Sequence, residues 1–195
     1  MDGLKLIRGF SATLLICSVA PLTTWAADLN LGRAASAAEV AGWNIDVLPD
    51  GTGLPPGKGS VSQGKTVYQN KCLACHGAKM EGGIGPALVG GEGSLTTEKP
   101  LKTVGSYWPY SSTLFDYIRR AMPFQAPQSL SNEDVYSVTG YILQANGLMK
   151  EDASVDASSL IAVKMPNRNG FYVDNRPDAK NTRCMQNCGT ATSKK

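Results

Sequence analysis

The chain lacks a long apolar segment, a strong net charge, any internal repeat and all but one histidine. Its longest apolar run, within residues 9–22, has about 14 residues, whereas a helix needs roughly 20 to span a bilayer. With 19 basic and 16 acidic residues the formal net charge is +3, which argues against nucleic acid as a partner. These absences predict one folded domain with extensions and no membrane span in the mature protein.

The single histidine, His76, ends the segment Cys72-Leu73-Ala74-Cys75-His76. C-x-x-C-H is the signature of covalent attachment of a c-type haem. Two thiols at this spacing can add to the two vinyl groups of one haem, and the adjacent imidazole can then ligate the iron. Because no other imidazole competes, the sequence predicts one covalently bound haem c, with Cys72 and Cys75 as its attachment points and His76 as an axial iron ligand.

The first 26 residues have the pattern of a secretory signal peptide. Lys5 and Arg8 precede the apolar run, and Thr24-Trp25-Ala26 offers small residues at a cleavage site. We therefore expect cleavage after Ala26 and a periplasmic location. In that oxidising compartment, the two cysteines near the C-terminus, Cys184 and Cys188, could form a disulfide.

Helix signals divide the rest of the chain. Residues 27–59 are a Pro/Gly-rich lead-in without regular structure. Capping and apolar spacing predict helices over 60–72, 113–120 and 131–146, with Ser60 and Ser131 as N-caps. We expect a haem domain over 60–149 and a C-terminal extension over 150–195, which starts with a polar, linker-like stretch.

A second axial ligand has to come from a residue well separated from His76, which argues against Met80. Met122 precedes a proline and lies 46 residues after His76, in the loop between the second and third predicted helices. We predict that its thioether ligates the iron. Met165, also followed by proline, is the rival ligand, and an open distal face is the third alternative.

Four other residues are predicted to surround the haem. A proximal histidine usually donates its second ring N–H to a carbonyl, and the turn at Gly85-Pro86 could supply that acceptor. Tyr107 and Trp108 could donate hydrogen bonds to haem propionates or simply belong to an apolar cluster. Arg119 could pair with a propionate or with a partner protein.

Charge is unevenly placed along the chain. Residues 58–120 hold eight basic and four acidic side chains, and residues 121–156 hold one basic and five acidic side chains. A basic surface on the haem side could steer an acidic redox partner towards it. Ordinary solvated lysines would give the same count.

Taken together, these motifs resemble a class I cytochrome c over residues 60–148. The resemblance implies an all-α fold with extended N- and C-terminal flanks. It also implies a close crossing of the first and last helices, where Gly64 would meet a residue such as Tyr141.

The flanks resemble the cytochrome c subunits of bacterial sulfur-oxidation systems, including those of sulfane dehydrogenases. The similar segments are Trp43–Gly57, Val104–Tyr110, Ala121–Phe124, Met165–Arg168 and Asn181–Cys184. The resemblance implies a periplasmic electron-transfer subunit that is not an enzyme by itself. Its partners would be a molybdenum-containing dehydrogenase subunit of the sulfite-oxidase type and a downstream electron acceptor. One C-x-x-C-H motif excludes a relay through a second haem in this chain.

Other function classes compete with this interpretation. A free-standing electron carrier would need no dehydrogenase, and a catalytic haem protein would need an open distal face. A structural zinc module could use Cys72, Cys75, Cys184 and Cys188, although 108 residues separate His76 from the second pair. A thiol-disulfide oxidoreductase is disfavoured because no strand-helix-strand pattern surrounds the C-x-x-C.

Overall fold

The computed structural model describes residues 32–176. The expected signal peptide and the pair Cys184 and Cys188 lie outside the described residues, so both remain predictions. The chain divides into two units, residues 1–40 and 41–195, which are described separately. Among residues 32–176, no helix has both the length and the apolar character needed to cross a membrane.

The described part of the first unit leads into helix α1 (Ala37–Trp43). Ser36 and Glu39 cap this helix reciprocally. The Glu39 backbone N–H donates to the Ser36 hydroxyl at 3.3 Å, and the Glu39 carboxylate accepts from the Ser36 backbone N–H at 2.8 Å. No residue of α1 is buried.

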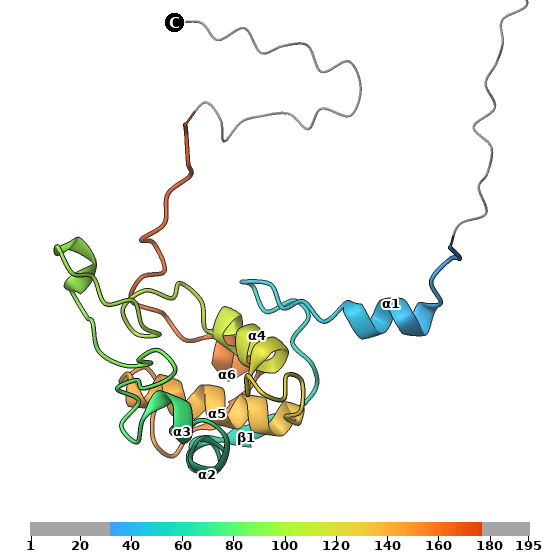
Figure 1. Ribbon diagram of the computed structural model, residues 1–195, viewed down its shortest axis with the longest axis horizontal. Coiled ribbons are helices and arrows are strands. Elements are labelled where there is room, and N and C mark those ends of the chain that lie inside the picture. The colour runs from blue at the N-terminus through green and yellow to red at the C-terminus, as the bar shows by residue number, and fades with distance from the viewer. Residues whose placement is uncertain (1–31, 177–195) are drawn as a thin grey trace, which may run out of the picture. The chain divides into compact units, whose positions relative to one another are not determined.

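The second unit is helical with one small sheet (Figure 1). This confirms the all-α class predicted from the sequence. Its elements are β1 (Lys58–Ser60), α2 (Val61–Lys71), α3 (Leu73–His76), a 3₁₀ turn (Ser94–Thr96), α4 (Ser111–Ala121), α5 (Asn132–Ala145), β2 (Ser154–Asp156) and α6 (Ala157–Ile161).

The predicted helices form within two residues of their expected ends, and side-chain caps explain where α2 and α5 start. The Ser60 hydroxyl accepts from the Gln63 backbone N–H at 3.2 Å, which starts α2. The Ser131 hydroxyl accepts from the Asp134 N–H at 3.1 Å, which starts α5. Each hydroxyl pairs with one of the N–H groups that a helix start leaves without an intrahelical partner.

Helices α2 and α5 cross closely, as predicted from Gly64. A Cβ atom at Gly64 would overlap the Ser137 carbonyl and lie 2.9 Å from the Tyr141 Cβ. Beside the crossing, the rings of Tyr68 and Tyr141 meet edge to face with centroids 5.6 Å apart. Only a residue without a side chain allows the two backbones this separation.

The hydrophobic core lies between α2, α4 and α5. Phe115 of α4 and Tyr136 of α5 are fully buried, with ring centroids 4.5 Å apart. The Tyr136 hydroxyl donates to the Pro55 carbonyl at 2.8 Å, so part of the lead-in is attached to the core. The other core residues without measurable exposure are Val135, Val138, Leu143, Val155 and Leu160.

The stretch after α5 is not the linker that its polar composition suggests. Strand β2 pairs antiparallel with β1, with Gly59 opposite Val155. Val155 and Leu160 are fully buried, and the Ser111 hydroxyl donates to the Leu160 carbonyl at 2.6 Å. The linker expected over residues 150–159 is therefore wrong for residues 154–159, because a few apolar side chains at the right register are enough to join the core. The boundary expected at residue 149 falls inside the packed structure.

Candidate haem-binding site

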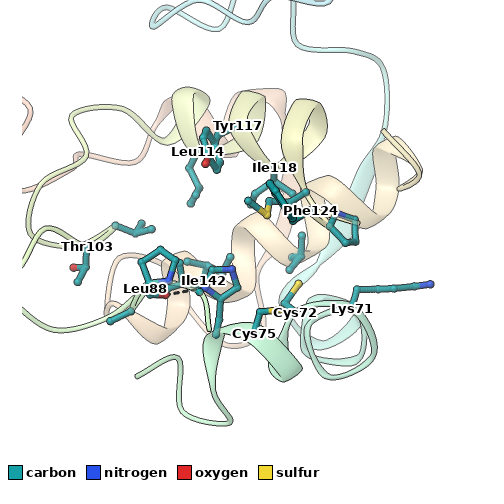
Figure 2. A pocket seen from close by; sticks show the side chains of 18 of the residues that line it. Lys71, Cys72, Cys75, Leu88, Thr103, Leu114, Tyr117, Ile118, Phe124 and Ile142 are labelled. Carbon is teal, nitrogen blue, oxygen red and sulfur yellow. Dashed lines mark hydrogen bonds between the residues drawn. The ribbon is translucent and has the colours of Figure 1, made fainter. Parts of the chain in front are cut away.

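The chain turns sharply between α2 and α3, and this turn gathers the C-x-x-C-H residues. The Cys72 N–H donates to the Tyr68 carbonyl at 2.9 Å, and the His76 N–H donates to the Cys72 carbonyl at 3.0 Å. One short helical turn therefore brings Cys72, Cys75 and His76 to the same pocket. Cys72 and Cys75 lie side by side at its lower edge in Figure 2.

Tyr68 fixes the far end of this turn. Its ring is buried, with 1% of its surface exposed, and its hydroxyl donates to the Gly77 carbonyl at 2.7 Å. Burial raises the pKa of the Tyr68 hydroxyl to about 12, so the group stays protonated and able to donate. Burial, with a smaller contribution from Cys75, likewise raises the pKa of the Cys72 thiol to about 11.

The orientation of His76 is set by a backbone carbonyl. Its Nδ1 lies 2.8 Å from the Pro86 carbonyl oxygen. A carbonyl only accepts, so Nδ1 carries the proton and Nε2 keeps a lone pair for a metal. Gly85 lies against the ring, since a Cβ there would be 2.9 Å from Cε1 and 3.0 Å from Nδ1. The sequence predicted this acceptor at the Gly85-Pro86 turn.

These groups line a cavity of about 470 Å³. Its walls are mainly apolar, and Figure 2 shows Leu114, Tyr117 and Ile118 of α4 on the side opposite Cys72 and Cys75. Ligand cavities in proteins have this size range and this apolar character with a few polar groups. The further apolar lining residues include Leu88, Val104, Leu130, Val138 and Ile142.

Met122 lies at the C-terminal end of α4, where its N–H donates to the Ile118 carbonyl at 3.0 Å. Among the methionines of residues 32–176, it alone lines the cavity. Met80 and Met165 are buried, with 2% and 3% of their surface exposed, and neither lines the cavity. The structure therefore brings the sulfur-bearing side chain of Met122, and not that of its rival Met165, to the walls that also hold His76.

The other predicted haem neighbours divide into two groups. Pro86 and Trp108 line the cavity, and the Trp108 ring meets Tyr117 edge to face at 5.5 Å. Tyr107 and Arg119 do not line it. Of the four predicted neighbours, the structure thus places Pro86 and Trp108 in the cavity lining, and the haem contacts of Tyr107 and Arg119 stay predictions.

The directions of the two side chains explain why neither lines the cavity. Tyr107 ends a turn over residues 104–107, where its N–H donates to the Thr103 carbonyl at 3.0 Å, and its ring packs on Phe171 with centroids 5.3 Å apart. Arg119 follows Ile118 by about 100° around α4 and donates instead to the Ile45 carbonyl at 3.3 Å.

Two lysines of the cavity lining were not predicted from the sequence. Lys71 and Lys102 line the cavity, and they are the only charged side chains in its lining. Lys71 precedes the haem motif directly, which was an available signal, whereas nothing in the sequence marks Lys102. At the mouth, Ile84 and Phe124 also line the cavity and are strongly exposed, at 92% and 79%.

The donor set suits a covalently attached haem better than a bare metal ion. Two thiols, one imidazole with a free Nε2 and one thioether line a mainly apolar cavity, and this set suits the vinyl groups, the iron and the macrocycle of haem c. Within residues 32–176, no three His, Cys, Asp or Glu side chains lie close enough to hold a metal ion. Two of the four thiols of the zinc alternative, Cys184 and Cys188, lie outside the described residues.

Three comparisons relate this chain to known proteins. Residues 59–142 match the family described as cytochrome c oxidase, cbb3-type, subunit III. A chain in the crystal structure of the sulfane dehydrogenase SoxCD from Paracoccus pantotrophus is 42% identical, with a TM-score of 0.71, and the match covers 86% of this chain and 85% of that one.

A thiosulfate dehydrogenase from Allochromatium vinosum is 31% identical over 118 residues, which is 54% of this chain and 37% of that protein. The chain thus spans little more than a third of the thiosulfate dehydrogenase. The match to the SoxCD chain, in contrast, extends over most of both sequences and includes the haem motif. The chain accordingly belongs to the c-type cytochromes, electron-transfer proteins with covalently bound haem c, and to the same family as the matched SoxCD chain.

Proposed function

We propose that the protein is the electron-accepting cytochrome subunit of a periplasmic, molybdenum-dependent dehydrogenase of reduced sulfur compounds. The observation that carries this proposal is the match to the SoxCD chain, because it extends beyond the haem domain into both flanks. A match limited to residues 59–142 would support any small carrier cytochrome. We expect a dedicated subunit to differ from a free carrier in the segments outside its haem domain.

Within this function we assign the haem contacts to four residues. Cys72 and Cys75 would form the two thioethers, His76 would ligate through Nε2, and Met122, at the end of α4, would ligate through its sulfur. When bound, the haem would supply one-electron chemistry, because its iron can alternate between Fe(III) and Fe(II). Occupied axial positions favour electron transfer over substrate binding at the iron, which disfavours the catalytic alternative.

The surrounding groups affect the reduction potential of the bound haem. The N–H of His76 donates to the Pro86 carbonyl, which holds the ring in one tautomer and strengthens Nε2 as a donor. The apolar lining excludes water and disfavours the additional charge of Fe(III). A neutral thioether from Met122 acts in the same direction, so we expect a comparatively high reduction potential.

The mouth of the cavity is the surface where we place the redox partner. Ile84, Tyr117 and Phe124 are exposed there, and Lys71 and Lys102 are the charged residues that line the same cavity. Exposed apolar side chains beside positive charge suit a partner with an apolar patch bordered by carboxylates. This refines the basic haem-side surface expected from the distribution of charge along the sequence.

Partner capture tests the proposed complex. The tagged, haem-loaded chain is expected to retain a molybdenum-containing protein from a periplasmic extract, measured as molybdenum by mass spectrometry. The captured complex should reduce the haem when thiosulfate, sulfite or a sulfane donor is added, and the isolated chain should not. Reduction of the isolated chain, or capture without molybdenum, would contradict the dehydrogenase assignment and favour a catalytic protein or a free carrier.

Ligand replacement tests the iron site separately. Met122→Ala should remove the near-infrared band that arises from sulfur ligation of Fe(III), and Met122→His should lower the reduction potential. Met165→Ala is the matched control, since Met165 is buried but does not line the cavity. A band that survives Met122→Ala and disappears in Met165→Ala would reverse the assignment.

A further inference from the structure

Helix α4 has two opposite faces with different contacts. Leu114, Tyr117 and Ile118 line the cavity, and Met122 follows one turn later on the same side. Residues 112, 116, 119 and 120 are offset from these positions by about half a turn, given 100° per residue. That second face contacts residues 45–49 of the lead-in, which lies beside α4 (Figure 1).

Hydrogen bonds join this lead-in segment to α4, and both the segment and the helix supply donors. The Val47 N–H donates to the Asp116 carboxylate at 3.2 Å, and the Arg119 guanidinium donates to the Ile45 carbonyl at 3.3 Å. Near the start of the helix, the Ser112 hydroxyl donates to the Pro49 carbonyl at 3.2 Å. The segment is therefore attached along about two turns of α4, from Ser112 to Arg119.

Arg120 of α4 forms ion pairs with two carboxylates, one on the helix and one on the lead-in segment. Its guanidinium nitrogen lies 2.7 Å from Asp116 and 2.8 Å from Asp46. Asp116 is the better shielded acid, with 21% of its side chain exposed against 65% for Asp46. The Val47 side chain beneath is buried at 7% exposure. The Asp116 carboxylate thus binds both the Val47 N–H of the lead-in segment and the Arg120 guanidinium of α4.

We infer that residues 45–49 act as a strap that holds α4 against the cavity, and that Asp116 is the residue through which the strap positions Met122. Met122 follows the last residue of α4 directly, and its N–H still bonds to the last turn. A shift or tilt of α4 therefore moves the Met122 side chain relative to His76. The inference rests on the proposed function through the assignment of Met122 as an iron ligand.

The test uses Asp116→Ala in the full-length, haem-loaded protein. Asp174→Ala is the matched control, because Asp174 is also paired with an arginine, Arg176, but through an exposed contact within the C-terminal segment. Three readouts report on the sulfur ligand: the near-infrared band of Fe(III), the reduction potential, and the rate at which the reduced protein binds carbon monoxide. None of the three responds to a loss of stability alone while the protein remains folded.

We expect Asp116→Ala to weaken the near-infrared band, lower the potential and accelerate carbon monoxide binding about fivefold, equivalent to about 1 kcal/mol of lost ligand stabilisation. Asp116→Asn keeps an oxygen acceptor for the Val47 N–H and should restore most of the wild-type behaviour. Asp174→Ala should match the wild type in all three readouts.

Asp46→Asn gives a milder second variant, because it alters only the outer partner of Arg120. If Asp116→Ala does not fold, acceleration of carbon monoxide binding in Asp46→Asn supports the strap, and wild-type behaviour there overturns it. A folded Asp116→Ala protein with unchanged band and rate also overturns it. A wild-type protein without the band would instead remove the ligand assignment, and this inference with it, while leaving the dehydrogenase partnership untouched.

Discussion

Gly64→Ala is expected to destabilise the protein by separating α2 from α5. The added methyl group would overlap the carbonyl of Ser137 and approach the Tyr141 Cβ to 2.9 Å. A backbone carbonyl inside α5 cannot rotate away as the end of a side chain can. The two helices must therefore move apart or tilt, which loosens the core that both contribute to.

The size of the effect follows from two opposing contributions. Overfilling a packed interior by one methylene-sized group costs about 1–3 kcal/mol, and backbone overlap places this site at the upper limit. Alanine is favoured over glycine in a helix by about 1 kcal/mol. The net loss in the free energy of unfolding is therefore about 2 kcal/mol. For a chain of this length, that corresponds to a fall in melting temperature of about 4–8 °C.

Guanidinium unfolding of the haem-loaded protein, followed by circular dichroism and by haem absorption, measures this loss. Gly42→Ala is the matched control, because Gly42 lies in α1 and a Cβ there would meet no atom within 4 Å. The control should be neutral or slightly stabilising. A Gly64→Ala protein as stable as the wild type would refute the close helix crossing.

Three further predictions concern the site and Asp156, the N-cap of α6, whose carboxylate accepts from the Ser159 backbone N–H at 2.8 Å. Gly85→Ala should displace the axial imidazole, weaken its bond to the backbone carbonyl and raise the reduction potential, measured by potentiometric titration; a lowered potential would contradict this. Phe124→Glu should slow reduction by the partner at least about tenfold, whereas Tyr172→Glu, equally exposed but outside the cavity lining, should not. Hydrogen bonds, first from the Ser159 backbone, lower the pKa of Asp156 to about 2 from 3.8, so its stabilising effect is present above about pH 4 and lost towards pH 2. The melting temperatures of wild type and Asp156→Ala should therefore converge on acidification, and a constant difference would contradict the capping role.

Local patterns account for most of what the sequence predicted correctly. The caps at Ser60 and Ser131 and the spacing of Cys72, Cys75 and His76 involve residues within four positions of one another. Such patterns act through the backbone of one turn, so they need no knowledge of distant segments.

Long-range pairing explains what the sequence did not show. Val155 and Leu160 are isolated apolar residues in a polar stretch, and only the pairing of Gly59 with Val155 places them in the core. The direction of Tyr107 depends likewise on Phe171, which lies 64 residues later in the chain. No periodicity within either segment carries this information.

The choice between Met122 and Met165 is a further case of this kind. Both precede proline, and the sequence favoured Met122 because it lies between two predicted helices, whereas Met165 lies beyond the last one. The structure adds that Met165 lies on the C-terminal segment after α6, buried and away from the cavity. Its place is set by β2 and α6, whose existence the sequence did not indicate.

The two proposed iron ligands are consequently held by different parts of the structure. His76 depends on α2 and α5, through Gly64, Tyr68 and the bond to Pro86. Met122 depends on α4, which is held from outside by the lead-in and by the bond from Ser111 to Leu160. Changes in the flanks should therefore alter the sulfur ligand while haem attachment remains intact.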